Sequence, residues 1–453
     1  MLRSTLMASA AGIVVVGLAM SPQAAASSDV VATIKVGQGP YNVTLDTGKQ
    51  RLYVANRDDA SVSVIDTKIN SVIATIPVGQ NPNTPVLDAP RNRLYVRNYA
   101  SNSVSVIDTT NNTVISNIAV GAHPLTPALD VDRMRLYVPN TDSNSLSVID
   151  LNSNTVIGTV AVGSEPRTPT LDSTRGKLFV PNSRGASISV VDLATLSVTG
   201  TIAVGQGPWA GEVNTATGRL YVPNHFESSV SVIDTAANTV VATIPVGTNP
   251  WDPSLDAARN RLYVANPASN SVSVIDTTTN TVISTVPVGG EPWGTTIDPQ
   301  HYRLYVPNDN DGTVSVIDTA SNAVVATLKA GTGPSAPAVD NARARLYVPN
   351  YGSNSVTVFA LRTSFAPSAP QNLSLAKAAG SSATLTWSAP VWAGSSKITG
   401  YTVIASPGGK TCKTKKTTCT ITGLKAGTRY TFEARATNKI GPGTPARTNP
   451  ATW

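Results

Sequence analysis

One short part of the sequence brings carboxylates, an imidazole and aromatic rings close together. Glu212 lies just after Trp209, and His225, Phe226 and Glu227 follow in the next loop of the same repeat. A carboxylate and an imidazole that converge on one substrate can act as a general acid and base. Glu212, His225 and Glu227 are therefore candidates for a catalytic site, and lyase or hydrolase chemistry is the function class that they support.

Three tryptophans form a second candidate site. Trp209, Trp251 and Trp293 recur every 42 residues, each directly after the proline of a Gly-x-x-Pro motif. Tryptophan rings at a surface suit stacking on sugars and other flat groups. We expect these rings, together with Phe226, to offer a ligand-binding surface for carbohydrate. The alternative is that they pack between strands as part of the core.

These residues belong to a repeat that runs through most of the 453-residue chain. Leu-Tyr-Val-x-Asn, or a near copy, recurs every 42 residues, and we number the eight repeats as units one to eight. Ser-Val-Ser-Val-Ile-Asp and the Gly-x-x-Pro motif keep the same period. The tyrosines of the first string are Tyr53, Tyr95, Tyr137, Tyr221, Tyr263, Tyr305 and Tyr347, with Phe179 in unit four.

Each unit alternates with period two, is rich in Val, Ile, Thr and Tyr, and is broken by Asn, Asp, Gly and Pro. This pattern predicts several short strands and no helix. Four antiparallel strands in about 42 residues is the size of one propeller blade. The sequence thus predicts an all-β fold, an eight-bladed β-propeller over residues 29–361, with a seven-bladed ring as the alternative. The strand that begins at Val30 precedes the first unit, and we expect it to complete the last blade.

The two repeated strings, Leu-Tyr-Val-x-Asn and Ser-Val-Ser-Val-Ile-Asp, resemble those of the YVTN family of β-propeller repeat proteins. This resemblance implies an exported or cell-surface bacterial propeller. It implies no particular chemistry. The recurring Asp66 and Asn56 positions are present in nearly every unit, which is typical of structural hydrogen bonds at turns and strand ends.

The repeat stops after Leu361, and residues 362–370 are expected to be a short linker rich in proline. Alternating segments at Ala383–Trp387, Ile398–Val403 and Gly423–Phe432 predict the strands of a small β-sandwich. Residues 371–453 resemble a fibronectin type III domain. The resemblance assigns Trp387 to the core, places Leu424 and Tyr430 in a tyrosine corner, and implies a spacer or adhesion module.

Charge is unevenly distributed between the two parts of the chain. The overall formal charge is +7, but from residue 364 onward eleven Lys and Arg face a single acid, Glu433. The densest cluster is Lys410, Lys413, Lys415 and Lys416. We expect this cluster to contact an anionic polymer such as wall phosphate or acidic polysaccharide, the alternative being a solvated surface. Nucleic acid is not an expected partner, because no aromatic residues are interleaved with these lysines.

The N-terminal residues 1–26 predict a secretory signal peptide, with Arg3, an apolar centre and Ala24-Ala25-Ala26 before the cleavage point. An N-terminal membrane anchor is the alternative. No transmembrane segment is expected after cleavage. In an exported protein the two cysteines, Cys412 and Cys419, predict one disulfide that closes a small hairpin loop.

These observations predict a secreted or cell-surface protein that binds a partner without catalysing a reaction. The propeller rim would bind a polysaccharide or a surface protein, and the basic domain would serve as spacer or anchor. A lyase or hydrolase centred on Glu212, or a structural component of a surface array, are the alternatives. We expect no cofactor and no metal, since the sequence has no phosphate-binding loop and only three histidines.

Overall fold

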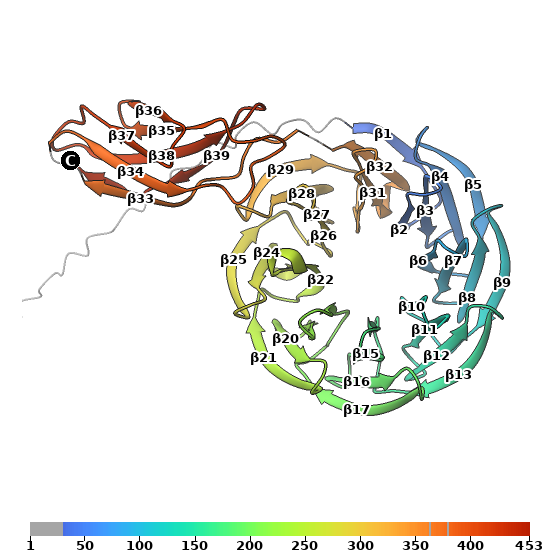
Figure 1. The fold of residues 1–453 in the computed structure, drawn as a ribbon. Coiled ribbons are helices and arrows are strands. Elements are labelled where there is room, and N and C mark those ends of the chain that lie inside the picture. The colour runs from blue at the N-terminus through green and yellow to red at the C-terminus, as the bar shows by residue number, and fades with distance from the viewer. Residues whose placement is uncertain (1–29, 362–363, 378–379) are drawn as a thin grey trace, which may run out of the picture.

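The computed structural model describes residues 30–361, 364–377 and 380–453. The expected signal peptide and part of the linker therefore lie outside the described residues. Residues 30–360 form four-stranded antiparallel sheets arranged as a propeller-like ring, and a β-sandwich lies beside it (Figure 1). None of the helices within these ranges has the length and apolar character of a membrane span.

Each unit forms one sheet whose strands run in chain order from the centre of the ring outward. Units one to four contain β2 (Pro40–Asp46), β3 (Arg51–Asn56), β4 (Ser61–Asp66) and β5 (Ser71–Pro77); β6 (Pro82–Asp88), β7 (Arg93–Asn98), β8 (Ser103–Asp108) and β9 (Thr113–Ala119); β10 (Ala128–Asp130), β11 (Arg135–Asn140), β12 (Ser145–Asp150) and β13 (Thr155–Ala161); and β14 (Thr170–Asp172), β15 (Lys177–Asn182), β16 (Ser187–Asp192) and β17 (Ser197–Ala203).

The later units keep this order, with short 3-10 helices η1 (Ala257–Arg259), η2 (Pro267–Ser269) and η3 (Tyr351–Ser353) in the turns. Their strands are β18 (Glu212–Asn214), β19 (Arg219–Asn224), β20 (Ser229–Asp234) and β21 (Thr239–Pro245); β22 (Trp251–Asp256), β23 (Arg261–Asn266), β24 (Ser271–Asp276) and β25 (Thr281–Pro287); β26 (Thr296–Asp298), β27 (Arg303–Asn308), β28 (Thr313–Asp318) and β29 (Ala323–Lys329); and β30 (Ala338–Asp340), β31 (Arg345–Asn350) and β32 (Ser355–Ala360).

The first strand of the chain completes the last sheet. β1 (Val30–Lys35) pairs antiparallel with β32, so the sheet of unit eight also has four strands. A hydrophobic cluster then joins this sheet to unit one, with Ile34 and Tyr347 packed against Leu52. The pairing and the packing together close the ring and cover sheet edges that would otherwise be free to pair.

Neighbouring sheets bury their faces against each other. Tyr221 and Val232 of unit five, for example, pack on Leu262 and Val264 of unit six, and equivalent clusters join the other units. One sheet alone has two apolar faces that it cannot bury, so stacking round the ring supplies the core.

The repeated asparagine explains a repeated glycine. Asn266 is fully buried, and its Nδ2 donates to the Oγ atoms of Ser271 and Ser273. A Cβ atom on Gly247 would lie 2.6 Å from Asn266 Cγ, so the position two residues after the outer strand needs glycine to make room. The repeated aspartates also have a structural role: Asp234 Oδ2 accepts from Arg219 Nη1 at 2.7 Å and its Oδ1 accepts two backbone N–H groups in the turn.

The C-terminal sandwich has one sheet of β33 (Gln371–Lys377), β34 (Ala383–Ser388) and β37 (Thr418–Ile421). The second contains β36 (Thr411–Thr414), β35 (Gly400–Ser406), β38 (Arg429–Thr437) and β39 (Pro442–Arg447), with β40 (Ala451–Thr452) paired to β38. The core holds Trp387, and Tyr430 Oη accepts from the Lys425 backbone N–H at 3.1 Å. This corner turns the chain, so residues 423–428 form no strand, contrary to the sequence-based expectation.

Candidate functional site

The three predicted tryptophans lie together at the inner ends of units five, six and seven. The Trp209 and Trp251 ring centroids are 4.2 Å apart, and those of Trp251 and Trp293 are 5.0 Å apart at an interplanar angle of 90°. All three rings are half-buried. We call them the tryptophan arc. Because the rings pack on one another and still reach solvent, their exposed parts form one aromatic surface rather than separate core residues.

The repeat itself positions the arc. In units five and seven the backbone N–H of Trp209 and Trp293 donates to the carbonyl oxygens of Pro223 and Pro307, at 3.0 and 3.2 Å. Equivalent bonds hold Leu125 and other residues at this position in further units. The main chain is therefore fixed by the fold, while the side chain at this position is free to differ from unit to unit.

Further side chains extend the arc at both sides. The Arg167 guanidinium carbon lies 4.3 Å from the Trp209 ring centroid, a cation–π contact. The His225 ring lies 5.0 Å from Trp251 and 4.9 Å from Phe226, whose side chain is 72 % exposed. Next to the arc, His225, Asn249, Glu291 and Trp293 help to line a pocket of about 290 Å³. The pocket and arc together offer polar groups beside aromatic rings.

Two carboxyl groups lie on the innermost strands near the arc. Glu212 of β18 and Asp252 of β22 both reach solvent, yet protein surrounds them on their other sides. This loss of bulk hydration raises the pKa of Glu212 to about 7, with the charge of Asp252 as a second cause. Desolvation likewise raises the pKa of Asp252 to about 6. Near neutral pH a substantial fraction of Glu212 is therefore protonated.

The three catalytic candidates make different contacts. Glu227 Oε2 accepts the Gln206 backbone N–H at 2.8 Å, which fixes the rim loop. Asp59 and Asp311 make the same contact in units one and seven. Among the described residues, no hydrogen bond or ion pair joins Glu212 to His225 or Glu227. The charge of Asp252, a residue that is not among the candidates predicted from the sequence, helps to raise the pKa of Glu212.

His225 has a position that is partly structural. Its Nδ1 lies 3.3 Å from the Pro250 carbonyl oxygen, and burial lowers the pKa of its imidazole. In unit three, the Thr141 hydroxyl donates to the equivalent carbonyl of Pro166. Contact between this position and the next unit therefore recurs, and the His225 ring meets the Trp251 ring at an interplanar angle of 76°.

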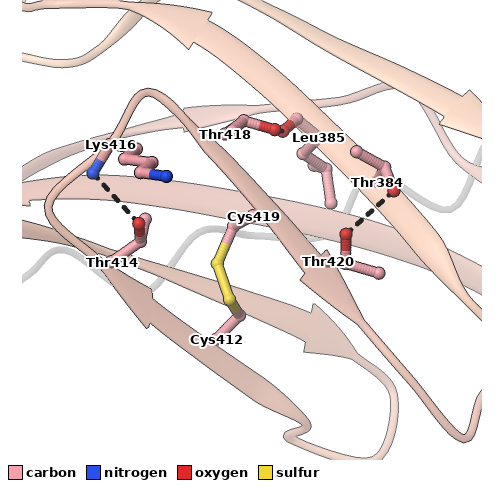
Figure 2. The surroundings of a disulfide bond; sticks show 8 residues. All are labelled: Thr384, Leu385, Cys412, Thr414, Lys416, Thr418, Cys419 and Thr420. Carbon is pink, nitrogen blue, oxygen red and sulfur yellow. Dashed lines mark hydrogen bonds between the residues drawn. A yellow bond between two sulfur atoms is a disulfide. The ribbon is translucent and has the colours of Figure 1, made fainter.

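The lysine cluster of the C-terminal domain is exposed, as expected. Lys410, Lys413, Lys415 and Lys416 lie close in sequence to Cys412 and Cys419, and Figure 2 shows Lys416 together with the disulfide between these cysteines. Within the described residues, none of the four forms an ion pair.

The disulfide is confirmed, but its expected role in closing a hairpin is wrong. β36 carries Cys412 and pairs with β35, whereas β37 carries Cys419 and pairs with β34. The bond therefore joins the two sheets of the sandwich where the chain crosses between them.

Aromatic residues join the C-terminal domain to the ring. Trp392 stacks on Tyr302 of unit seven with centroids 4.8 Å apart, and Phe365 lies 5.3 Å from Trp392. Arg303 lies over Phe365 at 4.6 Å, and Arg259 lies over Tyr302 at 3.7 Å. Tyr302 and Arg303 therefore place the domain against unit seven, and Arg259 of unit six supports Tyr302 from the ring side.

Comparison with known proteins agrees with this architecture. Residues 368–452 match the family model of the fibronectin type III domain. This part of the chain is a fibronectin type III domain.

Two solved structures resemble the ring. Hydrazine synthase of Kuenenia stuttgartiensis matches with a TM-score of 0.52 and 20% identity, covering 74% of this chain and 97% of that one. Dihydro-heme d1 dehydrogenase NirN, in complex with DHE, matches with a TM-score of 0.60 and 14% identity, covering 73% and 76%. At these identities the similarity shows a shared propeller-like fold.

Proposed function

We propose that this chain is an exported, non-enzymatic glycan-binding protein. Its ring would be an eight-bladed propeller, one blade for each four-stranded sheet, with β1 closing the last blade. The observation that carries the proposal is the tryptophan arc, in which three neighbouring units place half-buried rings in mutual contact. Sugar rings have apolar faces that stack on such surfaces, and Asn249 and Glu291 beside the arc supply hydrogen-bonding groups for hydroxyls.

The fibronectin type III domain is proposed as spacer and anchor. Its lysine cluster faces solvent, and no acidic side chain among the described residues pairs with it. The disulfide supports a location outside the cell or on its surface, because disulfides persist in oxidising environments. The aromatic contacts with unit seven would hold this domain in a fixed position beside the ring.

The test of glycan binding is calorimetry of the full chain against soluble cell-wall and extracellular oligosaccharides. Trp251→Ala removes the central ring of the arc and should weaken binding at least tenfold. Leu125→Ala changes the equivalent position in unit three and serves as the matched control. No binding by the unaltered chain, or equal binding by both variants, would contradict the proposal.

Anchoring is tested by pelleting the full chain with anionic wall polymer at low salt and at roughly 0.5 M salt, where charge attraction is screened. A triple Lys→Gln variant at 413, 415 and 416 should remain in the supernatant. The same charge change at Lys397, Lys425 and Lys439, which are exposed elsewhere on the domain, is the control. If both triple variants pellet equally, the lysine cluster has no special role.

A second function, hydrolase or lyase action on the bound glycan, has one specific observation in its favour. Glu212 and Asp252 have raised pKa values and lie on neighbouring inner strands, and a protonated carboxyl paired with a second one is the machinery of glycoside cleavage. Glu212→Gln should then abolish turnover while binding persists. Absence of product from every glycan that binds would exclude this second function.

A further inference from the structure

Arg97 occupies a position where the other units have small or cyclic residues. It is the penultimate residue of β7, and the equivalent residues are Ala55, Pro139, Pro181, Pro223, Ala265, Pro307 and Pro349. A position that seven units fill with alanine or proline does not require a guanidinium for folding. The arginine in unit two therefore needs a separate explanation.

The guanidinium of Arg97 is buried and lacks a counter-ion. Arg97 is 8 % exposed, and its Nη1 donates to the Pro124 carbonyl oxygen at 3.2 Å. Its Nε has no partner, and among the described residues no carboxylate forms an ion pair with it. The titratable groups that act on it electrostatically are Arg57, which is also cationic, and the phenols of Tyr41 and Tyr99.

Burial without a counter-ion is costly for a charge. Desolvation lowers the pKa of Arg97 to about 10, so the group still carries its charge near neutral pH. An arginine presents a planar fork of N–H donors that matches a carboxylate in two parallel hydrogen bonds. An anionic ligand group would supply the partner that the protein itself does not.

Arg97 faces the same rim as the tryptophan arc. Its partner Pro124 is the proline of the unit-three Gly-x-x-Pro motif, and the arc tryptophans follow the prolines of that same motif in their own units. In the ring, β7 lies across the centre from β22, which carries Trp251 (Figure 1). Tyr41 lies within electrostatic reach of both Arg97 and Asp252. One rim thus has an aromatic side and a cationic side.

Two asparagine side chains lie on the same side of the rim as Arg97. Asn83 is buried next to Arg97 in the register of β6 and β7, and its Oδ1 accepts from Asn42 Nδ2 at 2.9 Å. These groups suit hydroxyls and carboxylates rather than apolar surfaces. We propose that the ligand of this rim is an acidic oligosaccharide, bound with a carboxylate on Arg97 and with sugar faces stacked on the tryptophan arc. This inference rests on the glycan-binding function proposed above.

The test uses the full chain and matched probes. Oligosaccharides of uronic acid and of muramic acid type are compared by calorimetry with their methyl esters, which keep the shape but lose the charge, and with sulfated and neutral oligosaccharides. At least one carboxylated probe should bind the unaltered chain about ten- to a hundredfold more tightly than its ester. Arg97→Ala and Arg97→Met should remove that difference, so that acid and ester bind equally.

A second measurement separates a binding role from a structural one. The unit-one and unit-six residues show that alanine fits this position, and removing an unpaired buried charge should leave the thermal midpoint of Arg97→Met equal to or above that of the unaltered chain. A lowered midpoint for both variants would mean that Arg97 braces unit two against unit three, and would overturn the inference.

The outcomes are distinguishable from failure of the proposed function. If esters and acids bind equally and Trp251→Ala weakens both, glycan binding stands and the acidic-ligand inference falls. If sulfated probes alone show the Arg97-dependent gain, the carboxylate assignment is wrong. If no oligosaccharide binds, the proposed function falls as well, and with it the inference that rests on it.

Discussion

The carboxyl pair on the inner strands makes stability depend on pH in a specific direction. Glu212 has its pKa raised from 4.5 to about 7 in the folded chain, so folding penalises the ionised form. Below pH 4.5 the group is protonated in both folded and unfolded chains, and the penalty is absent. As pH rises through 7 the folded state must ionise it at a cost, and stability is lost. Glu212→Gln removes the penalty.

The size of the effect follows from the shift and from the exposure of the group. A shift of this size corresponds to about 3 kcal/mol if taken at face value. Because the carboxyl reaches solvent, screening reduces this to about 1 kcal/mol. We expect Glu212→Gln to match the unaltered chain at pH 4 and to be about 1 kcal/mol more stable at pH 8.

The assay is urea unfolding followed by circular dichroism at intervals between pH 4 and pH 8.5. Glu227→Gln is the matched control, because its carboxylate is exposed in a rim loop and accepts a backbone N–H. That variant should show no gain at high pH. A Glu212→Gln difference that is constant with pH, or that grows toward pH 4, would refute the argument from desolvation.

Three other predictions concern the supporting structure. Replacing both Cys412 and Cys419 by Ser should lower the stability of the sandwich by about 2 kcal/mol in urea, from the loop entropy of a short closure; no change would mean that the bond adds nothing to the folded sandwich. Trp392→Ala should free the domain from the ring at a cost of about 1–3 kcal/mol in docking and broaden the particle in small-angle scattering, whereas Trp392→Phe should not. Gly247→Ala should cost about 1–3 kcal/mol, while Gly200→Ala, whose Cβ would meet no atom within 4 Å, should be close to neutral.

The 42-residue period predicts most of the ring because each unit has the same pattern of strand and turn residues. The strands, the closing role of the segment from Val30 and the structural use of the repeated Asp and Asn all follow from that repetition. The tyrosine corner at Tyr430 was implied by the resemblance to the fibronectin type III family, and the hydrogen bond from the Lys425 backbone N–H to its hydroxyl confirms it. Periodicity says nothing, in contrast, about which sheet a strand of the sandwich joins, so Cys412 and Cys419 were expected within one hairpin.

The candidate site was only partly predicted, because only one position was compared across all the units. The tryptophans were found by comparing one position across the units, and the same comparison applied to neighbouring positions would have selected Asp252 and Arg97. Asp252 stands where other units have Asn, Thr, Ala or Gly. Glu227, by contrast, was selected for its chemistry, although the aspartates at the same position in units one and seven indicate a loop contact.

In a repeat protein, equivalent positions in the different units can therefore be compared with one another. Where all units agree, the residue is explained by the fold, as with Asn266 and its serines. Where a residue in one unit differs from its equivalents in the other units and lowers stability, we infer that it contacts a ligand. Arg97 is buried without a counter-ion and the arc exposes three large rings, and both departures lie on one rim. At the position of Arg97 the other units have alanine or proline, so packing does not require the arginine, and the proposed acidic glycan would account for both departures with a single cause.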